Sequence, residues 1–251
     1  AASLLGGCGA VDYYWQSVHG QYDLLARAKP LGEAIEATSD PRLKARLELA
    51  ERVREFASQS LDLPSNGSYR RYTDLGRPFV IWNVFATPRL SLVPHEWCYP
   101  IAGCVSYRGY FDEKDARAEA SSLSAAGNDV YLGGVPAYST LGWFDDPVLS
   151  SFVRYPETEF VRLIFHELAH QLIYVKGDTV FNESYATALS DEGLARWIAT
   201  QPPDVKARLD AERARGARLR GAFQRLIVEA RSRLSAVYAS DASPAAKSQQ
   251  K

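Results

Sequence analysis

Residues 162–175 read RLIFHELAHQLIYV, and within them His166, Glu167 and His170 form the pattern HExxH. Apolar residues recur around the motif with helical spacing, which predicts a largely buried helix. Two residues that are four apart lie on one helix face with Cβ atoms roughly 5–6 Å apart, so both imidazoles could bind one zinc ion. Glu167 is then placed to act as the general base on a water molecule. Two histidines could simply decorate a helix, but buried imidazoles beside a carboxylate need partners, and a metal would supply them.

A catalytic zinc site uses three protein ligands, so the motif requires one more. The sequence predicts a helix over 158–175, a turn at 176–178 and a second helix to about Thr200. If the two helices are antiparallel, the residue five positions beyond the turn lies level with His170, which is five positions before it. That residue is Glu183, in the stretch FNESYAT, and we predict it to be the third ligand.

Two further carboxylates, Asp191 and Glu192, lie about two turns farther along the second predicted helix. As ligands they would overshoot both histidines. They could instead hydrogen-bond a liganding histidine and hold its orientation. A solvated helix face is the alternative explanation for both.

Strand-like stretches occupy the middle of the chain. They are rich in β-branched and aromatic residues and lie at 79–85 (FVIWNVF), 104–111 (CVSYRGYF) and 129–135 (DVYLGGV). Between the last two, residues 112–126 have an acidic first turn, an Ala-rich interior and Gly127 just past the end, which predicts a helix. The order strand, helix, strand predicts one crossover unit in a small sheet.

The chain as a whole is predicted to be α+β and mainly helical. A small central sheet accompanies a zincin-type HExxH helix that packs against the following, glutamate-bearing helix. No internal repeat or obvious linker divides the chain, so we expect one domain over residues 9–240. Its parts are a helical N-terminal part (11–61), a β-containing part (70–150), the zinc-binding helices (158–200) and a C-terminal helix (204–238). The polar tail 241–251 is predicted to be disordered.

The composition is that of an ordinary globular protein, since 46% of the 251 residues are hydrophobic and 24% are charged. The 29 basic and 30 acidic residues give a formal net charge of -1, which provides no overall field for nucleic acid or anionic lipid. We interpret the arginines of 204–238 as a solvated helix face and assign them no nucleic-acid role.

The N-terminal stretch AASLLGGCGA is typical of the end of a secretory signal. Residues 1–8 resemble the lipobox of bacterial lipoproteins, in which Cys8 would carry the lipid. An ordinary N-terminal segment is the alternative. Cys98 and Cys104, close together in WCYPIAGC, are predicted to form a disulfide if the protein is exported.

Several longer motifs together resemble a bacterial family described as putative zinc aminopeptidases, many of them predicted lipoproteins. The resemblance runs from Tyr13 to about Trp197. The similar stretches are YYWQSVHGQ, LPSNGSYRRYTDLGRP, WNVFATP, WCYPIAGCVSYRGYF, AYSTLGWFDDP, FHELAHQ and FNESYAT. The family is similar to the gluzincins, whose third zinc ligand is a glutamate on a following helix, and this agrees with the position of Glu183.

The expected activity is hydrolysis of peptides or proteins with Zn²⁺ as the cofactor, and the family name implies an aminopeptidase. A zinc endopeptidase of the cell envelope and a non-catalytic zinc-binding lipoprotein are the alternatives. Tyr138 and Tyr185 could donate a phenol to the developing oxyanion, although either could be a packing aromatic. The expected location is the periplasmic side of a bacterial membrane, with the membrane contacted only through a lipid on Cys8.

Overall fold

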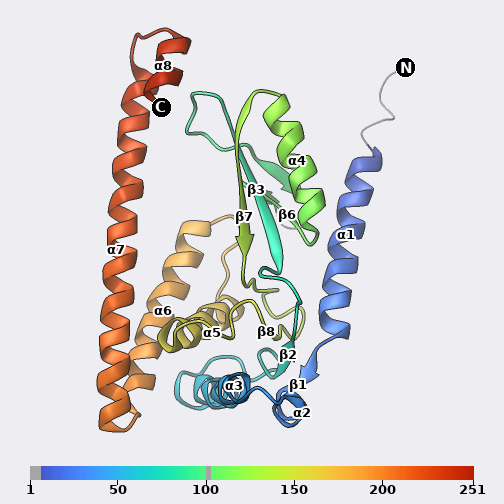
Figure 1. The fold of residues 1–251 in the computed structure, drawn as a ribbon, viewed down its shortest axis with the longest axis vertical. Coiled ribbons are helices and arrows are strands. Elements are labelled where there is room, and N and C mark those ends of the chain that lie inside the picture. Colours follow the sequence, from blue (N-terminus) through green and yellow to red (C-terminus); the bar gives the residue numbers. More distant parts are fainter. Residues whose placement is uncertain (1–6, 100–102) are drawn as a thin grey trace.

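The computed structural model describes residues 7–99 and 103–251 (Figure 1). Its helices are α1 (Gly7–Ala26), α2 (Leu31–Ala37), α3 (Pro41–Ser60), α4 (Glu113–Ala125), α5 (Glu157–Leu172), α6 (Thr179–Ala199), α7 (Pro203–Ala239) and α8 (Pro244–Gln250). Its strands are β1 (Lys29–Pro30), β2 (Arg71–Thr73), β3 (Ile81–Pro88), β4 (Trp97–Tyr99), β5 (Gly103–Val105), β6 (Arg108–Tyr110), β7 (Asn128–Val135) and β8 (Val148–Leu149). The fold is α+β and mainly helical, as predicted.

The largest sheet has the strand order β6-β3-β7, with β3 antiparallel to both neighbours. The outer strands β6 and β7 are therefore parallel to each other, and α4 connects them. This is the predicted strand, helix, strand crossover, with β3 lying between its two strands. Trp82 and Val84 of β3 alternate toward α4, where they pack with Tyr110 and Ala116 in a small core.

The predicted strand 104–111 is wrong as one element. Its first part, β5, forms a hairpin with β4, and its second part, β6, pairs with β3. The chain leaves extended pairing at Ser106 and Tyr107, so two short strands serve two different sheets. The third sheet, β1-β2-β8, was not predicted, because its strands are only two or three residues long.

The main core lies among the helices. On α5 the residues Val161, Ile164, Phe165 and Leu168 recur three and four positions apart and are all fully buried. They pack with buried residues of α3, α6 and α7. Gly193 of α6 permits a close approach, since a Cβ there would lie 2.9 Å from Cδ2 of Phe165. The HExxH helix is therefore held rigidly from several sides.

The C-terminal region consists of two helices. The long helix α7 runs along one side of the molecule, and its first part packs on α5 and α6 (Figure 1). The tail 241–251, predicted to be disordered, instead contains α8, which Ser243 caps by accepting a hydrogen bond from the Ala246 N–H. Within the described part of the chain, no helix combines the length and apolar character needed to cross a bilayer.

Candidate metal centre

The centre is built where α5 ends and α6 begins. The helix α5 stops at Leu172, three residues before its predicted end, and the chain continues extended from Ile173. The side chain of Asn182 joins the two sides of the turn, because its amide donates to the Val175 carbonyl and accepts from the Val175 N–H, both at 2.8 Å. Asp178, in the turn, caps α6 by accepting from the Phe181 N–H at 2.9 Å. These contacts fix the position of the residue after Asn182, which is Glu183.

His166, His170 and Glu183 come together at this place, with their potential ligand atoms all within 4.8 Å of one another. One carboxylate oxygen of Glu183 lies 3.3 Å from Nε2 of His166, and the other lies 3.5 Å from Nε2 of His170. The two imidazole rings are 4.8 Å apart and nearly perpendicular. The His170 side chain is 8% exposed and that of Glu183 is 57% exposed, so the centre opens to solvent on the glutamate side.

This geometry fits a tetrahedral metal ion. Ligand atoms about 2.0–2.1 Å from a tetrahedral zinc are about 3.3 Å from one another, close to the two nitrogen–oxygen distances found here. Burial lowers the pKa of both histidines, and the proximity of His170 lowers that of His166 further. The lowered pKa favours the neutral imidazole, which is the form that binds metals.

Glu167 lies beside the two histidines on α5. Burial raises its pKa to about 8, and the negative charges of Glu183 and Asp146 add to the rise. A carboxyl group with a pKa near neutral can both accept and return a proton under ordinary conditions. Glu167 is therefore a candidate for proton transfer at this site.

The structure does not bring Asp191 and Glu192 to the histidines. Glu192 is exposed and forms an ion pair with Arg196 at 2.8 Å. The Nδ1 atoms of His166 and His170 are buried and have no hydrogen-bond partner among the described residues, so neither carboxylate contacts them. Both carboxylates lie too far along α6, so the suggestion that either of them orients a liganding histidine is not supported by the geometry.

The two tyrosines considered as oxyanion donors are also engaged elsewhere. The Tyr138 hydroxyl donates to Oε1 of Gln21, and burial raises the pKa of Tyr138 well above its ordinary value. Tyr185 stacks on Phe181 with the ring centroids 6.1 Å apart. Because Tyr185 is two residues beyond Glu183, it lies about 200° around the helix and points to the opposite side. Neither hydroxyl is directed at the metal centre.

The loop between α3 and β2 braces the end of α5. The amide of Asn66 donates to Oε1 of Gln171 at 2.8 Å, and Nε2 of Gln171 donates to the Ser68 hydroxyl at 3.1 Å. Gln171 follows His170 directly, so this bracing helps to position the second histidine. The available signal was the cluster of small polar residues in LPSNGS, but nothing in it indicates which side chain it contacts.

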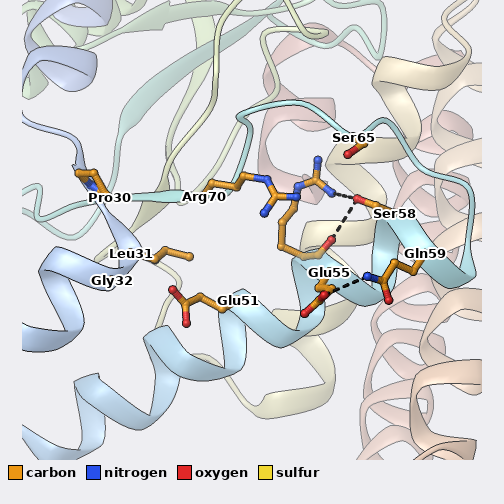
Figure 2. Close-up of a pocket in the computed structure, with 10 residues that line it drawn as sticks. Pro30, Leu31, Gly32, Glu51, Glu55, Ser58, Gln59, Ser65 and Arg70 are labelled. Atoms are coloured by element: carbon orange, nitrogen blue, oxygen red, sulfur yellow. Dashed lines mark hydrogen bonds between the residues drawn. The ribbon is translucent and has the colours of Figure 1, made fainter.

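The same loop is held on its other side by Arg54. The fully buried guanidinium donates to the Ser68 carbonyl at 2.7 Å and to the Pro64 and Asn66 carbonyls. Burial lowers its pKa to about 10, and the charge of Arg70 adds to the effect. Arg54 is one of the residues that line the polar pocket shown in Figure 2, together with Glu51, Glu55, Ser58 and Arg70 among others. Arg54 and Arg70, which both line the pocket, donate hydrogen bonds to carbonyls of the loop, so we interpret the pocket as part of the loop support.

The chain matches the model of a known protein family. The model of the family described as "Putative aminopeptidase" matches residues 12–251, which is nearly the whole chain. No curated protein and no solved structure gave a significant match. The chain therefore belongs to the putative aminopeptidase family.

Proposed function

We propose that the protein is a zinc-dependent aminopeptidase in which His166, His170 and Glu183 hold Zn²⁺ and Glu167 is the general base. The observation that supports this most directly is the position of the Glu183 carboxylate, 3.3 and 3.5 Å from the Nε2 atoms of the two histidines. Two imidazoles and one carboxylate are a donor set that zinc peptidases use, with a further position left free for chemistry. The family description agrees with peptide hydrolysis as the reaction.

The proposed roles follow from the side chains. When bound, zinc supplies a Lewis acid that polarises the scissile carbonyl and makes water nucleophilic near pH 7. The Glu167 carboxylate accepts the proton that the attacking water loses. The same group, with its raised pKa, then delivers that proton to the leaving amine. The buried helix α5 keeps Glu167 and the histidines in a fixed relation during both transfers.

The test compares the wild type with Glu167→Gln, each loaded with zinc. Glutamine keeps the size of the side chain but cannot accept the proton, so turnover should fall by at least the roughly 10² to 10⁴ typical of general acid-base catalysis. Zinc content should stay the same, and the melting temperature of the variant should not fall below that of the wild type. Glu192→Gln is the matched control, because Glu192 is exposed on α6 and pairs only with Arg196 among the described residues. Undiminished turnover in Glu167→Gln would refute the proposed mechanism.

The substrate panel should pair each peptide with its N-acetylated form. Cleavage of the free peptide alone supports an aminopeptidase, because that enzyme recognises the free α-amine. Equal cleavage of both forms would identify an endopeptidase instead. A zinc-loaded wild type that cleaves neither form would favour the zinc-binding scaffold.

We also propose that the protein is exported and anchored by a lipid on Cys8, on the periplasmic side of a bacterial membrane. The lipobox-like sequence before Cys8 and the disulfide between Cys98 and Cys104 both support export. Residues 1–6 lie outside the described part of the chain, so the structure does not bear on the signal-like segment. Mass spectrometry of the protein expressed with its own leader should find a lipid on Cys8, and an unmodified Cys8 would contradict the proposal.

A further inference from the structure

We propose that a cleft beside the metal centre, called here the tyrosine cleft, binds a large apolar side chain of the peptide substrate. This inference rests on the proposed peptidase function. The tyrosine cleft lies between α1 and the face of β3 and β6 that α4 does not cover. Its volume is about 450 Å³, within the range of small-ligand sites. Its walls are aromatic and consist of Tyr13, Tyr14, Tyr99, Tyr107 and Phe111.

The floor of the cleft is hollowed by a glycine. Ile81 and Asn83 of β3 point to this face, because they alternate with the residues that pack against α4. Gly109 of β6 pairs with Asn83. A Cβ at Gly109 would lie 3.1 Å from Oδ1 of Asn83 and 3.2 Å from Cγ2 of Ile81, so any larger residue would make the floor shallower.

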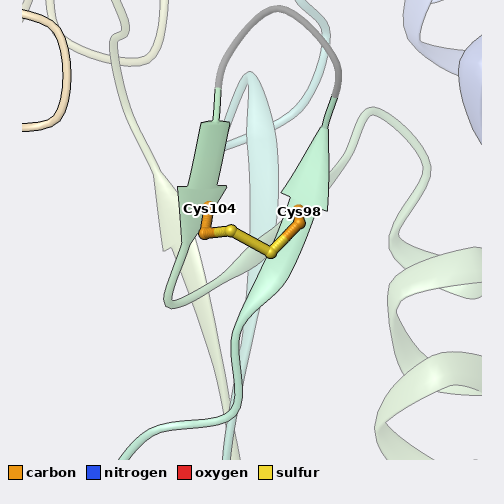
Figure 3. Close-up of a disulfide and its surroundings, with 2 residues drawn as sticks. All are labelled: Cys98 and Cys104. Carbon is orange, nitrogen blue, oxygen red and sulfur yellow. A yellow bond between two sulfur atoms is a disulfide. The ribbon is translucent and has the colours of Figure 1, made fainter.

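The roof of the cleft is the β4-β5 hairpin. Cys98 and Cys104 lie opposite each other in this hairpin and are joined by a disulfide (Figure 3). The next residue on each strand, Tyr99 and Val105, lines the cleft. Tyr99 in turn stacks on Tyr13 of α1, with the ring centroids 5.6 Å apart. The disulfide therefore holds in place the part of the chain that closes the cleft from above.

Two contacts connect the tyrosine cleft to the metal centre. Phe111 packs edge-on against Tyr138 with the ring centroids 6.1 Å apart, and the hydroxyl of the next residue, Ser139, donates to the Glu167 carbonyl at 3.4 Å. Tyr107 lines the cleft as well; burial is the main cause that raises its pKa, and the charges of Tyr174, Tyr13 and Glu183 add to the rise. A peptide whose scissile bond lies at the centre can therefore place a neighbouring side chain in the cleft.

The residues that line the tyrosine cleft determine which kind of substrate side chain it can bind. Of the described residues that line the cleft, none carries a charge, so a charged side chain would lose hydration without gaining a partner. Aromatic rings, by contrast, gain both apolar burial and favourable edge or stacked contacts with the tyrosines. Phenylalanine should therefore be preferred over alanine by about tenfold to a hundredfold in kcat/KM, the range typical of a hydrophobic pocket.

The experiment measures hydrolysis of Ala-Ala-Ala, Phe-Ala-Ala, Ala-Phe-Ala and Ala-Asp-Ala by the zinc-loaded wild type and by Val105→Trp. Tryptophan at position 105 fills the cleft from its roof. Val93→Trp is the matched control, since Val93 is 70% exposed in the loop before the hairpin and lines no part of the cleft. Zinc content and melting temperature are measured for every variant. If Val105→Trp fails to fold, Gly109→Ala replaces it, because its added Cβ makes the floor shallower.

We expect the wild type and Val93→Trp to prefer the phenylalanine peptides. Val105→Trp or Gly109→Ala should lose this preference. Hydrolysis of Ala-Ala-Ala by Val93→Trp should equal that by the wild type, because Val93 lines no part of the cleft. A wild type that cleaves the alanine and phenylalanine peptides equally, or a preference that survives both cleft variants, would overturn the proposal.

Calorimetric binding separates this inference from the proposed function. Zinc-loaded Glu167→Gln, titrated with Ala-Phe-Ala and Ala-Ala-Ala, should bind the phenylalanine peptide at least tenfold more tightly, and Val105→Trp in the same background should remove the difference. If the peptides bind in this way but the wild type hydrolyses none of them, the peptidase proposal is refuted and the binding site is supported. If the wild type hydrolyses the peptides but neither binding nor rate differs between the phenylalanine and alanine peptides, the tyrosine cleft is refuted and the peptidase proposal is supported.

Discussion

Replacing Glu183 by glutamine should remove much of the stability that zinc confers while leaving the metal-free protein almost unchanged. In the structure the carboxylate contacts the Nε2 atoms of His166 and His170 at 3.3 and 3.5 Å, but its side chain is 57% exposed. Contacts of such an exposed carboxylate contribute at most about 1 kcal/mol. The free energy of unfolding of the metal-free variant should therefore lie within about 1 kcal/mol of the wild-type value.

The zinc-loaded protein should respond differently, because one of the three proposed ligands is lost. Mutating a residue that only hydrogen-bonds a metal ligand typically weakens metal affinity by about 10- to 100-fold. Loss of a ligand itself should therefore weaken zinc affinity by at least about 100-fold. A hundredfold weaker affinity lowers the stabilisation by about 2.7 kcal/mol at saturating zinc. For a chain of this size the melting temperature should fall by roughly 5–10 °C.

Scanning calorimetry of the wild type and Glu183→Gln, each with and without zinc, measures the difference in zinc-dependent stability, and elemental analysis measures the zinc content. Glu192→Gln is the control on the same helix, since its carboxylate pairs with Arg196 and lies away from the histidines. If Glu183→Gln shows the same zinc-dependent rise in melting temperature as the wild type, the assignment of Glu183 as a ligand is refuted.

Three further outcomes are expected. Burial raises the pKa of Asp146 to about 6, so its favourable contribution is complete below about pH 4 and is lost as the pH rises through 6. The free energy of unfolding of Asp146→Asn, measured with urea and compared with that of the wild type, should therefore be more favourable at pH 7.5 than at pH 4 by on the order of 2–3 kcal/mol. The same difference from the wild type at both pH values would contradict this. Replacing both Cys98 and Cys104 by serine should cost roughly 2 kcal/mol in the same assay, and peptide mapping that finds two free thiols in the wild type would exclude the disulfide. Asn182→Ala should loosen the turn at Val175 and weaken zinc binding about tenfold in a competition titration with a chelator, whereas wild-type affinity would show that the turn is held by other contacts.

The arrangement of the candidate ligands was largely predictable because it depends on short-range periodicity. His166 and His170 are one helical turn apart, so their common face follows from the α-helix alone. Glu183 follows from one more assumption, an antiparallel pair of helices joined by a short turn. The structure places its carboxylate beside both histidines as that assumption requires. Local spacing was sufficient because all three residues belong to one helical hairpin.

Tertiary structure alone decided the surroundings of that centre. The bracing of Gln171 by Asn66 and Ser68 joins residues more than 100 positions apart, and the engagement of Tyr138 by Gln21 spans 117 positions. The predicted strand 104–111 divides between two sheets because its pairing partners, β3 and β4, lie elsewhere in the chain. A sequence pattern reports the face that a residue occupies on its own element, whereas the partner on that face depends on how the elements pack together. The sequence by itself thus determined the helical hairpin and its candidate ligands, and the packed structure determined what supports them and which cleft lies beside them.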